Sequence, residues 1–361
     1  MDRKVKVGII GCGGIANGKH MPSLSKLNDV EMVAFCDLIP EKAEKAKNQY
    51  GTPDAKVYTD YHELLKDPSI EVVHVLTPNR SHAPITIDAL HAGKHVMCEK
   101  PMAKTAADAK KMVEAAKETG KKLTIGYQHR HKPEAIYLKH IIDRGDLGEI
   151  YFAKAYAVRR RGTPNWGVFL NEYEQGGGPL IDIGTHSLDL TLYLMNNYEP
   201  RMVVGTKYKK VKNPECGNPW GGWAEGANKV EDSAFGFIEM KNGATIMLEA
   251  SWALNTSEPI KEGSTMLCGT DAGAQIKNGA TVINKGEFNR LVEIKPDFSE
   301  GGVSFYRGVS NNPGETEARS WIDAVKNDTE VVVKPEQAYV VSQILEAIYS
   351  SAETGKPVFF D

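Results

Sequence analysis

The sequence contains little of what marks secreted, metal-binding or membrane proteins. Its five cysteines, at positions 12, 36, 98, 216 and 268, are odd in number and form no C-x-x-C pair, so neither a disulfide framework nor a zinc site is predicted. We interpret them as thiols in a reducing cytoplasm. No apolar run approaches the ~18 residues of a membrane span, and the first apolar run is interrupted by Lys6 and ended by glycines, unlike a signal peptide.

Charge of one sign is also scarce. The net charge is −3, and residues of like charge form no long blocks along the sequence. The basic run Arg159 to Arg161 is short, so no nucleic-acid or membrane surface is expected. The composition is that of a globular protein: 361 residues, 41% hydrophobic and 25% charged, with room for two domains. We find neither an internal repeat nor a low-complexity segment.

The order of apolar patterns predicts two domains with different sheets. Through residue 126, short apolar runs alternate with helical patterns, which predicts an α/β domain with a parallel, doubly wound sheet. Over residues 127–361, longer alternating strands such as 233–240 and 244–254, around a Lys241-Asn242-Gly243 turn, predict an α+β domain with a mostly antiparallel sheet. Residues 210–228 lack periodicity, which suggests a long functional loop or an assembly element.

A glycine loop ends the first apolar run. Gly11, Gly13, Gly14 and Ala16 form the pattern G-x-G-x-x-A, a dinucleotide-binding fingerprint in which the backbone comes close to an anionic group at a helix N-terminus. A strand precedes the pattern, a helix follows it, and a second strand ends in Asp37. This context favours the fingerprint over the alternative of a plain glycine-rich turn.

Asp37 also predicts which nucleotide is bound. It follows the first glycine at about the separation at which a carboxylate accepts hydrogen bonds from an adenosine ribose. A carboxylate repels a 2′-phosphate, and the next residues, Leu38, Ile39 and Pro40, supply no arginine to neutralise one. We therefore predict NAD(H) in preference to NADP(H).

The ends of the later strands carry polar residues. Ligands of open parallel sheets bind at the carboxyl ends of the strands, so the residues that follow each strand are candidates. They are Thr77-Pro78-Asn79 with His82, then Glu99-Lys100-Pro101, then Tyr127-Gln128-His129-Arg130. Lys100 is placed at the rim of the predicted cofactor crevice, although a solvated surface lysine is the alternative.

A second cluster follows three glycines at 176–178. If the helix that follows includes Asp182, the spacing of four residues puts Asp182 and His186 on one face, with Asp189 near it. No metal is predicted, because a further ligand of matching spacing is missing. A helix-capping aspartate with a packed histidine is the structural alternative, which weakens once Lys100 is counted.

Lys100, Asp182 and His186 together supply what oxidation of a secondary alcohol by NAD requires. That reaction needs a base for the hydroxyl proton, a cation or donor for the alkoxide, and a fixed path for the hydride. Histidine titrates near neutral pH and suits the base, lysine suits the donor, and the carboxylate orients both. We predict these three residues to be catalytic and to contact the substrate.

The sequence resembles the glucose-fructose oxidoreductase, inositol dehydrogenase and MocA family. The likeness covers nearly the whole chain, and its motifs are GCGGIA at 11–16, TPNRSH at 77–82, EKP at 99–101, GYQHR at 126–130 and GGGPLIDIGTHSLDL at 176–190. It implies an N-terminal Rossmann domain, an open-faced C-terminal sheet that assembles into dimers or tetramers, and NAD(P)-linked chemistry on a sugar or cyclitol. The family's catalytic lysine, aspartate and histidine fall on Lys100, Asp182 and His186.

The resemblance also implies a cofactor site. The nicotinamide side would involve Glu99, Gln128 and Arg130, and Thr77, Asn79 and His82 would line the groove. The full predicted cofactor set is Gly11, Gly13, Gly14, Ile15, Asp37, Leu38, Thr77, Pro78, Asn79, His82, Glu99, Lys100, Gln128 and Arg130.

Substrate contacts are predicted from the segment 159–169. Arg161, Asn165 and Trp166 are expected to face the substrate, because an indole stacks on the C–H face of a pyranose. A core position for Trp166 is the alternative. His129 is a weaker candidate, as are Trp220 and Trp223, which could reach a neighbouring subunit. The segment is similar to family members that act on glucosides, where oxidation at the third ring carbon recurs.

Three functional hypotheses follow. The first is an NAD-dependent dehydrogenase of a sugar, glycoside or cyclitol. The second is a glycoside-cleaving enzyme that oxidises, eliminates and recycles its own NAD, and it would accumulate no NADH. The third is an NAD-binding regulator without catalysis, which the presence of both Lys100 and His186 disfavours.

Overall fold

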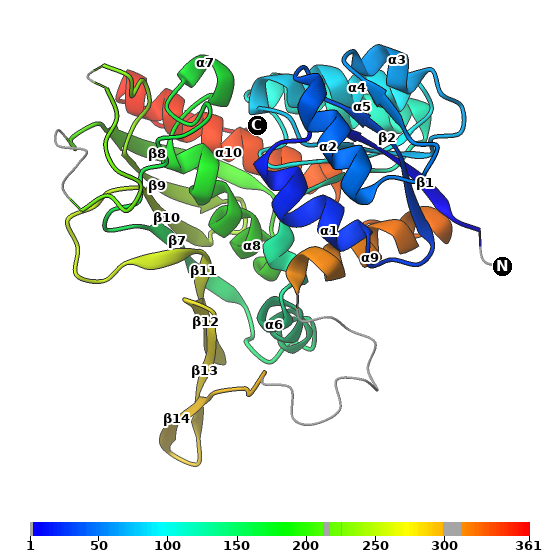
Figure 1. Ribbon diagram of the computed structural model, residues 1–361. Helices are drawn as coiled ribbons and strands as arrows, with labels where there is room; N and C mark the ends of the chain where they lie inside the picture. The colour runs from blue at the N-terminus through cyan, green and yellow to red at the C-terminus, as the bar shows by residue number, and fades with distance from the viewer. Residues whose placement is uncertain (1–2, 212–216, 225, 299–311) are drawn as a thin grey trace. The chain divides into compact units, whose positions relative to one another are not determined.

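The structure is a computed structural model that describes residues 3–211, 217–224, 226–298 and 312–361 (Figure 1). The contacts of the chain divide it into two compact units. The first contains residues 1–131 and 309–339, and the second contains residues 132–308 and 340–361.

The first unit is built on a parallel sheet of six strands in the order β3-β2-β1-β4-β5-β6. Its strands are β1 (Val5–Ile10), β2 (Val30–Cys36), β3 (Lys56–Tyr58), β4 (Val72–Val75), β5 (His95–Cys98) and β6 (Leu123–Ile125). The apolar run of β1 is buried on both faces, as a parallel sheet covered by helices requires. The predicted doubly wound sheet is therefore confirmed.

Helices follow the strands of this unit as the sequence pattern predicted. They are α1 (Met21–Leu24), α2 (Pro40–Tyr50), α3 (Tyr61–Leu65), α4 (His82–His91), α5 (Ala106–Thr119) and α9 (Pro313–Lys326), with short turns η1 (Ala16–His20), η2 (Asn79–Ser81) and η3 (Gln128–His131). Helix α5 is capped at both ends. The Thr105 hydroxyl accepts the Asp108 N–H, and Gly120 takes the left-handed conformation that ends the helix.

The predicted domain boundary differs from the observed division. The sequence placed everything after residue 126 in the second domain, whereas η3 and α9 belong to the first unit. Helix α9 lies against α1 (Figure 1) and η3. Its Trp321 and Ile322 are buried in the same core as Val5, and Arg319 donates to Asp29 at 2.7 Å. An apolar face on a late helix does not reveal which sheet it covers, so the order of patterns alone could not give this packing.

The second unit contains a sheet of nine strands in the order β14-β13-β12-β11-β7-β10-β9-β8-β15. The strands are β7 (Ile150–Val158), β8 (Pro200–Tyr208), β9 (Ser233–Met240), β10 (Thr245–Ser251), β11 (Ile260–Gly269), β12 (Ala272–Lys277), β13 (Ala280–Glu287), β14 (Arg290–Ile294) and β15 (Val358–Phe359). Only β7 and β10 pair in parallel among these described strands, and the other neighbours are antiparallel. The expected mostly antiparallel sheet and the hairpin at residues 241–243 are confirmed.

Helices cover one face of this sheet. The helical segments of the unit are α6 (Pro133–Asp143), α7 (Glu172–Gln175), η4 (Leu180–Gly184) and α8 (Thr185–Met195), and α10 (Pro335–Thr354) begins in the first unit and continues into the second. Helix α8 packs on β7 and β11, and Ile348 of α10 packs against Gly205 and Gly236. The opposite face carries apolar side chains at its surface, such as Val204 at 37% and Phe237 at 38% exposure.

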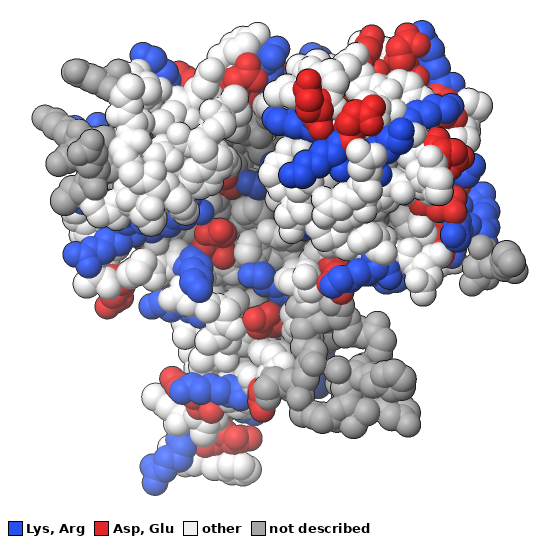
Figure 2. All heavy atoms as spheres, in the orientation of Figure 1, with Lys and Arg blue, Asp and Glu red and all other residues white. Residues whose placement is uncertain are grey.

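The loop predicted at 210–228 is described in part, because residues 212–216 and 225 lie outside the described residues. On the face seen in Figure 2, acidic and basic side chains are interspersed. Within the described ranges, no helix is both long and apolar enough to span a bilayer.

Candidate active site

The glycine loop of the first unit forms a cradle at the carboxyl end of β1. Gly11 has φ of +92°, and a β-carbon there would lie 2.6 Å from the Leu76 carbonyl oxygen, so only glycine fits. At Gly13 and Gly14, by contrast, an added β-carbon would meet no atom within 4 Å. The next residue, Ile15, is exposed. The loop thus closes tightly against β4 and leaves open space where a pyrophosphate would approach the backbone.

Asn17 strengthens this loop and was not predicted from the sequence. Its side-chain amide donates to the carbonyls of Cys12 at 2.9 Å and Gly13 at 2.8 Å. An asparagine four residues after a loop glycine is the available signal, since that spacing returns a helical side chain to the loop.

Asp37 lies directly after β2, beside the glycine loop. Its carboxylate accepts the Cys12 N–H at 2.9 Å and the Ile39 N–H at 2.9 Å. These bonds fix the carboxylate in place while the side chain stays partly exposed, and Leu38 beside it is exposed. The cradle and the fixed carboxylate together fit an adenosine dinucleotide with a free ribose diol.

The loop after β4 is joined to the loop after β5 by a buried histidine. Thr77, Pro78 and Asn79 begin this loop, as predicted for the edge of the sheet. The imidazole of His82 lies 2.7 Å from the Pro101 carbonyl oxygen and 2.8 Å from that of Thr77. Burial lowers the pKa of His82, and its two carbonyl partners oppose this shift. The structure therefore gives His82 a role in holding both loops together, which the sequence did not predict.

Glu99 belongs to a buried group of titratable side chains, here called the Lys19 cluster (Lys19, His20, His74, Glu99 and Glu317). The Glu99 Oε1 atom lies 2.6 Å from Lys19 Nζ and 2.8 Å from His20 Nε2, and Lys19 Nζ also lies 3.0 Å from Glu317 Oε2. His20 and His74 meet through their Nδ1 atoms at 3.2 Å. Burial alone would raise the pKa of Glu99, but the Lys19 charge and the His20 hydrogen bond hold it well below its usual range.

The Lys19 cluster also supports Lys100. The second carboxylate oxygen of Glu99 accepts the Lys100 backbone N–H at 3.0 Å, which fixes the loop after β5. Lys100 itself is half-buried and precedes a cis peptide bond to Pro101. The family resemblance predicts that Glu99 contributes to the nicotinamide side of the cofactor site. Its contacts within the Lys19 cluster and with the Lys100 N–H give this side chain a structural role as well.

The remaining predicted residues of the first unit lie in η3, directly after β6. Gln128 is half-buried, and His129 and Arg130 are buried. The Arg130 guanidinium donates to the Val332 carbonyl at 3.1 Å and to Gln337 Oε1 at 2.6 Å. Through these contacts Arg130 holds η3 against the start of α10. No pattern in the local sequence indicated them.

In the second unit, one continuous helical segment carries the predicted aspartate and histidine. Asp182 lies in the π-helical turn η4, and His186 lies in the first turn of α8 and is buried. The Asp182 Oδ2 atom accepts the indole N–H of Trp252 at 3.0 Å. Trp252 is fully buried at the end of β10, packed with Ile183. The sequence missed Trp252, whose only signal is its place directly after a strand.

A buried carboxylate holds the start of this helical segment. Glu231 accepts the Gly178 N–H at 2.9 Å, the Leu180 N–H at 3.3 Å and the Tyr349 hydroxyl at 2.8 Å. Burial raises the pKa of Glu231, and the hydrogen bonds it accepts oppose that rise. A β-carbon at Gly178 would lie 2.2 Å from the Glu231 carbonyl oxygen, and one at Gly177 would lie 2.1 Å from the Tyr349 hydroxyl oxygen. The glycines before Asp182 are therefore required by this packing.

The predicted substrate segment runs from the end of β7 toward α7. The Arg161 guanidinium donates to Asn255 Oδ1 at 2.6 Å. The Asn165 side-chain amide donates to the Gly222 carbonyl at 2.9 Å and to that of Trp220. Trp166 is 48% exposed, so the alternative of a core position does not hold.

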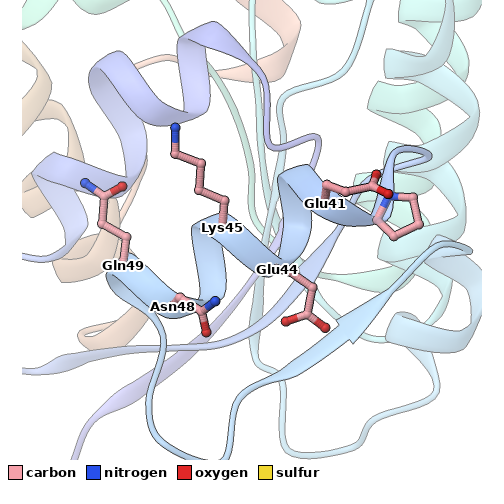
Figure 3. A pocket seen from close by; sticks show the side chains of 6 residues that line it. Glu41, Glu44, Lys45, Asn48 and Gln49 are labelled. Carbon is pink, nitrogen blue, oxygen red and sulfur yellow. The ribbon is translucent and has the colours of Figure 1, made fainter.

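A separate hollow of about 660 Å³ lies on the outer surface of α2 and carries no site (Figure 3). Its lining comes from one helix, and the labelled side chains fan out from that helix without converging on a common point. In the described part of the chain, no group of three or more His, Cys, Asp or Glu side chains is placed to hold a metal ion.

Comparisons with known proteins cover both units. Residues 5–127 match the family described as "Oxidoreductase family, NAD-binding Rossmann fold", and residues 139–360 match "Oxidoreductase family, C-terminal alpha/beta domain". The chain is 37% identical over 358 residues to D-glucoside 3-dehydrogenase of Escherichia coli K12, covering 98% of this chain and 97% of that protein. It is 39% identical over 146 residues, 40% of this chain and 43% of the relative, to inositol 2-dehydrogenase of Salmonella typhimurium.

A solved structure agrees with the fold. Aldose-aldose oxidoreductase from Caulobacter crescentus, complexed with glycerol, superposes with a TM-score of 0.80 at 26% identity, covering 99% of this chain and all of the other. The protein is thus an NAD-binding oxidoreductase, and the chain belongs to the glucose-fructose oxidoreductase, inositol dehydrogenase and MocA family.

Proposed function

We propose that this protein is an NAD-dependent dehydrogenase that oxidises a secondary hydroxyl of a glucoside, at the third ring carbon. The observation that carries the proposal is the extent of the likeness to D-glucoside 3-dehydrogenase, which covers 98% of the chain. The likeness to inositol 2-dehydrogenase covers 40% of the chain. Because substrates differ more in the sugar-binding part than in the nucleotide-binding part, the match over the full length favours a glucoside over a cyclitol.

The residues of the chain supply the proton chemistry of this reaction. When bound, NAD supplies the acceptor for the hydride that leaves the carbinol carbon. In our proposal His186 removes the hydroxyl proton, Lys100 donates a hydrogen bond to the same oxygen, and Asp182 orients both. The hydrogen bond from Trp252 supports this role because it fixes one Asp182 oxygen. In the direction of reduction, the same imidazole returns the proton.

Replacing either residue that acts on the hydroxyl oxygen should cause the greatest loss of activity. Lys100→Met and His186→Ala should each lower kcat by about 100-fold or more, because a positioned acid or base contributes a factor of that order. The assay follows NADH absorbance with a panel of free hexoses, inositols and methyl glucosides. Lys110→Met, an exposed lysine of α5 in the first unit, is the matched control and should retain the wild-type rate.

The affinity for NAD, measured by calorimetry, should stay nearly unchanged in these variants, since neither change alters the glycine loop or Asp37. Rates close to wild type in either variant would reject the assignment. Cleavage of the glycoside without accumulation of NADH would instead support the oxidation and elimination alternative.

We also propose that the protein is a cytoplasmic homo-oligomer, a dimer or tetramer. The apolar side chains on the uncovered sheet face, Val204 and Phe237 among them, support self-association. The free thiols Cys12, Cys36 and Cys98 are buried and suit a reducing compartment. A monomeric mass at micromolar concentration, measured by light scattering, would contradict the oligomer.

A further inference from the structure

Two exposed tryptophans of the second unit form an aromatic pair that the chemistry above does not use. Trp166 is 48% exposed and Trp220 is 42% exposed, and their ring centres lie 4.8 Å apart at an angle of 80°. Burial of large apolar side chains is favourable, so two tryptophans that stay in contact at the surface indicate a place where a ligand or partner binds.

The pair is held in place by a short hydrogen-bond network between two loops. Asn218 accepts the Thr163 N–H at 3.1 Å through Oδ1 and donates to the Thr163 carbonyl at 3.1 Å through Nδ2. Asn165 donates to the Gly222 carbonyl at 2.9 Å. These bonds tie the segment that bears Trp166 to the segment that bears Trp220, so the two rings are arranged before any ligand arrives.

The aromatic pair is connected to Asp182 through packed rings. Phe169 lies 5.7 Å from Trp166 and 6.5 Å from Trp252, centre to centre, and the Trp252 indole donates to Asp182. Two ring-to-ring contacts therefore separate Trp166 from the direct partner of Asp182. This separation suits a substrate whose reacting sugar ring lies at Asp182 while the group attached to that sugar lies at Trp166.

We propose that Trp166 and Trp220 form a platform for the ring of the group carried on the anomeric carbon, so that the enzyme recognises glycosides with a ring-shaped aglycone. The inference rests on the proposed function, because Asp182 must hold the reacting sugar. A sugar or phenyl ring presents a flat apolar face to an indole, while the Arg159 guanidinium, 5.8 Å from the centre of the Trp220 ring, adds a polar group beside it.

The test compares two substrates that differ only in the aglycone, methyl glucoside and phenyl glucoside. The wild-type enzyme should show a KM for phenyl glucoside about five- to tenfold below that for methyl glucoside, because one aromatic contact contributes a factor of that size. Trp166→Ala and Trp220→Ala should raise the KM for phenyl glucoside to the methyl glucoside value. In both variants the KM for methyl glucoside should change less than the KM for phenyl glucoside, because methyl glucoside lacks the ring that the platform contacts.

Two further variants control for general damage. Trp166→Phe keeps an aromatic face and should restore most of the preference for phenyl glucoside. Phe288→Ala removes an aromatic side chain that is 94% exposed in the same unit, and it should leave both KM values unchanged. Equal losses with both substrates in Trp166→Ala would overturn the platform, as would a change of oligomeric mass in place of a change of KM.

Calorimetry separates this inference from the proposed function. The binding of phenyl glucoside to the NADH-bound protein is measured for the wild type and for Trp166→Ala. If no glycoside is oxidised but phenyl glucoside binds about five- to tenfold more weakly to the variant, the proposed function fails and the platform stands. If glucosides are oxidised but both proteins bind phenyl glucoside equally, only the platform fails.

Discussion

Each unit buries a carboxylate next to residues that we propose to act in catalysis, but the two carboxylates are stabilised in different ways. Glu99 of the first unit is paired with the Lys19 ammonium and a histidine, and its pKa is held well below the usual range. Glu231 of the second unit accepts two backbone N–H groups and a tyrosine hydroxyl, and burial raises its pKa. One site depends on an opposite charge, and the other depends on uncharged donors at the start of a helical segment.

The two kinds of stabilisation predict different responses to pH and to mutation. The Lys19 cluster is an ion network, so removing one member leaves another charge buried and unpaired. The Glu231 site loses only a hydrogen bond when the carboxyl group becomes an amide, because none of the described residues forms an ion pair with this carboxylate. The two sites are therefore expected to depend on pH in opposite directions.

Lys19→Met should be the more damaging change. It leaves Glu99 and Glu317 buried without their ammonium partner, and breaking such a pair costs about 3–5 kcal/mol of unfolding free energy near pH 7. Because the folded pKa of Glu99 lies below its unfolded value, its contribution is present above the unfolded pKa and is lost as the pH falls toward the folded pKa. The loss in the variant should therefore shrink as the pH falls below about 4.5, the ordinary pKa of a glutamate carboxyl group.

Urea unfolding at a series of pH values measures this trend. Lys45→Met, an exposed lysine on α2, is the control and should be neutral. A difference between wild type and Lys19→Met that stays constant from pH 7 to pH 3 would show that packing, and not charge, explains the loss.

Asp37 is a third carboxylate and differs from both, because it is partly exposed and the hydrogen bonds from the Cys12 and Ile39 N–H groups only orient it. Asp37→Ala should raise the KM for NAD by about tenfold to 100-fold, because a factor of that size corresponds to the free energy of one or two hydrogen bonds to a charged group. It should also lower the preference for NAD over NADP, since the repulsion of a 2′-phosphate is removed.

The kcat/KM ratio for the two cofactors measures this effect. Glu41→Ala, on the nearby surface of α2, should leave the ratio unchanged. A wild-type enzyme that already prefers NADP would contradict the role given to Asp37.

The sequence predicted what local patterns control. The alternation of strands and helices, the glycine loop, Asp37 and the hairpin at residues 241–243 each depend on residues a few positions apart, and each is present. The partners of Glu99, Arg130 and Glu231 could not be predicted, because they come from segments far away in the chain. Helix α9 illustrates the same limit: its apolar face showed that it packs, but its contacts with Asp29 and the first sheet required the folded chain.

Glu231→Gln should have the smallest effect on stability and gives the sharpest contrast with Lys19→Met. The amide keeps one oxygen to accept an N–H but loses the other, so we expect a loss of about 1 kcal/mol at acid pH. The raised folded pKa of Glu231 means that the folded state prefers the protonated acid, so wild-type stability falls as the pH rises from the unfolded pKa toward the folded one. Glutamine carries no such penalty.

The stability of Glu231→Gln should therefore approach or exceed that of the wild type as the pH rises above about 5, while Lys19→Met moves in the opposite direction. Tyr349→Phe is the matched control, because it removes one donor to Glu231 without changing the charge and should raise the pKa of this carboxyl group further. A Glu231→Gln loss that grows with pH would mean that the N–H groups of Gly178 and Leu180 favour the ionised carboxylate enough to outweigh its burial. In that case both units would stabilise a buried anion, and they would differ only in using a lysine or a helix start to do so.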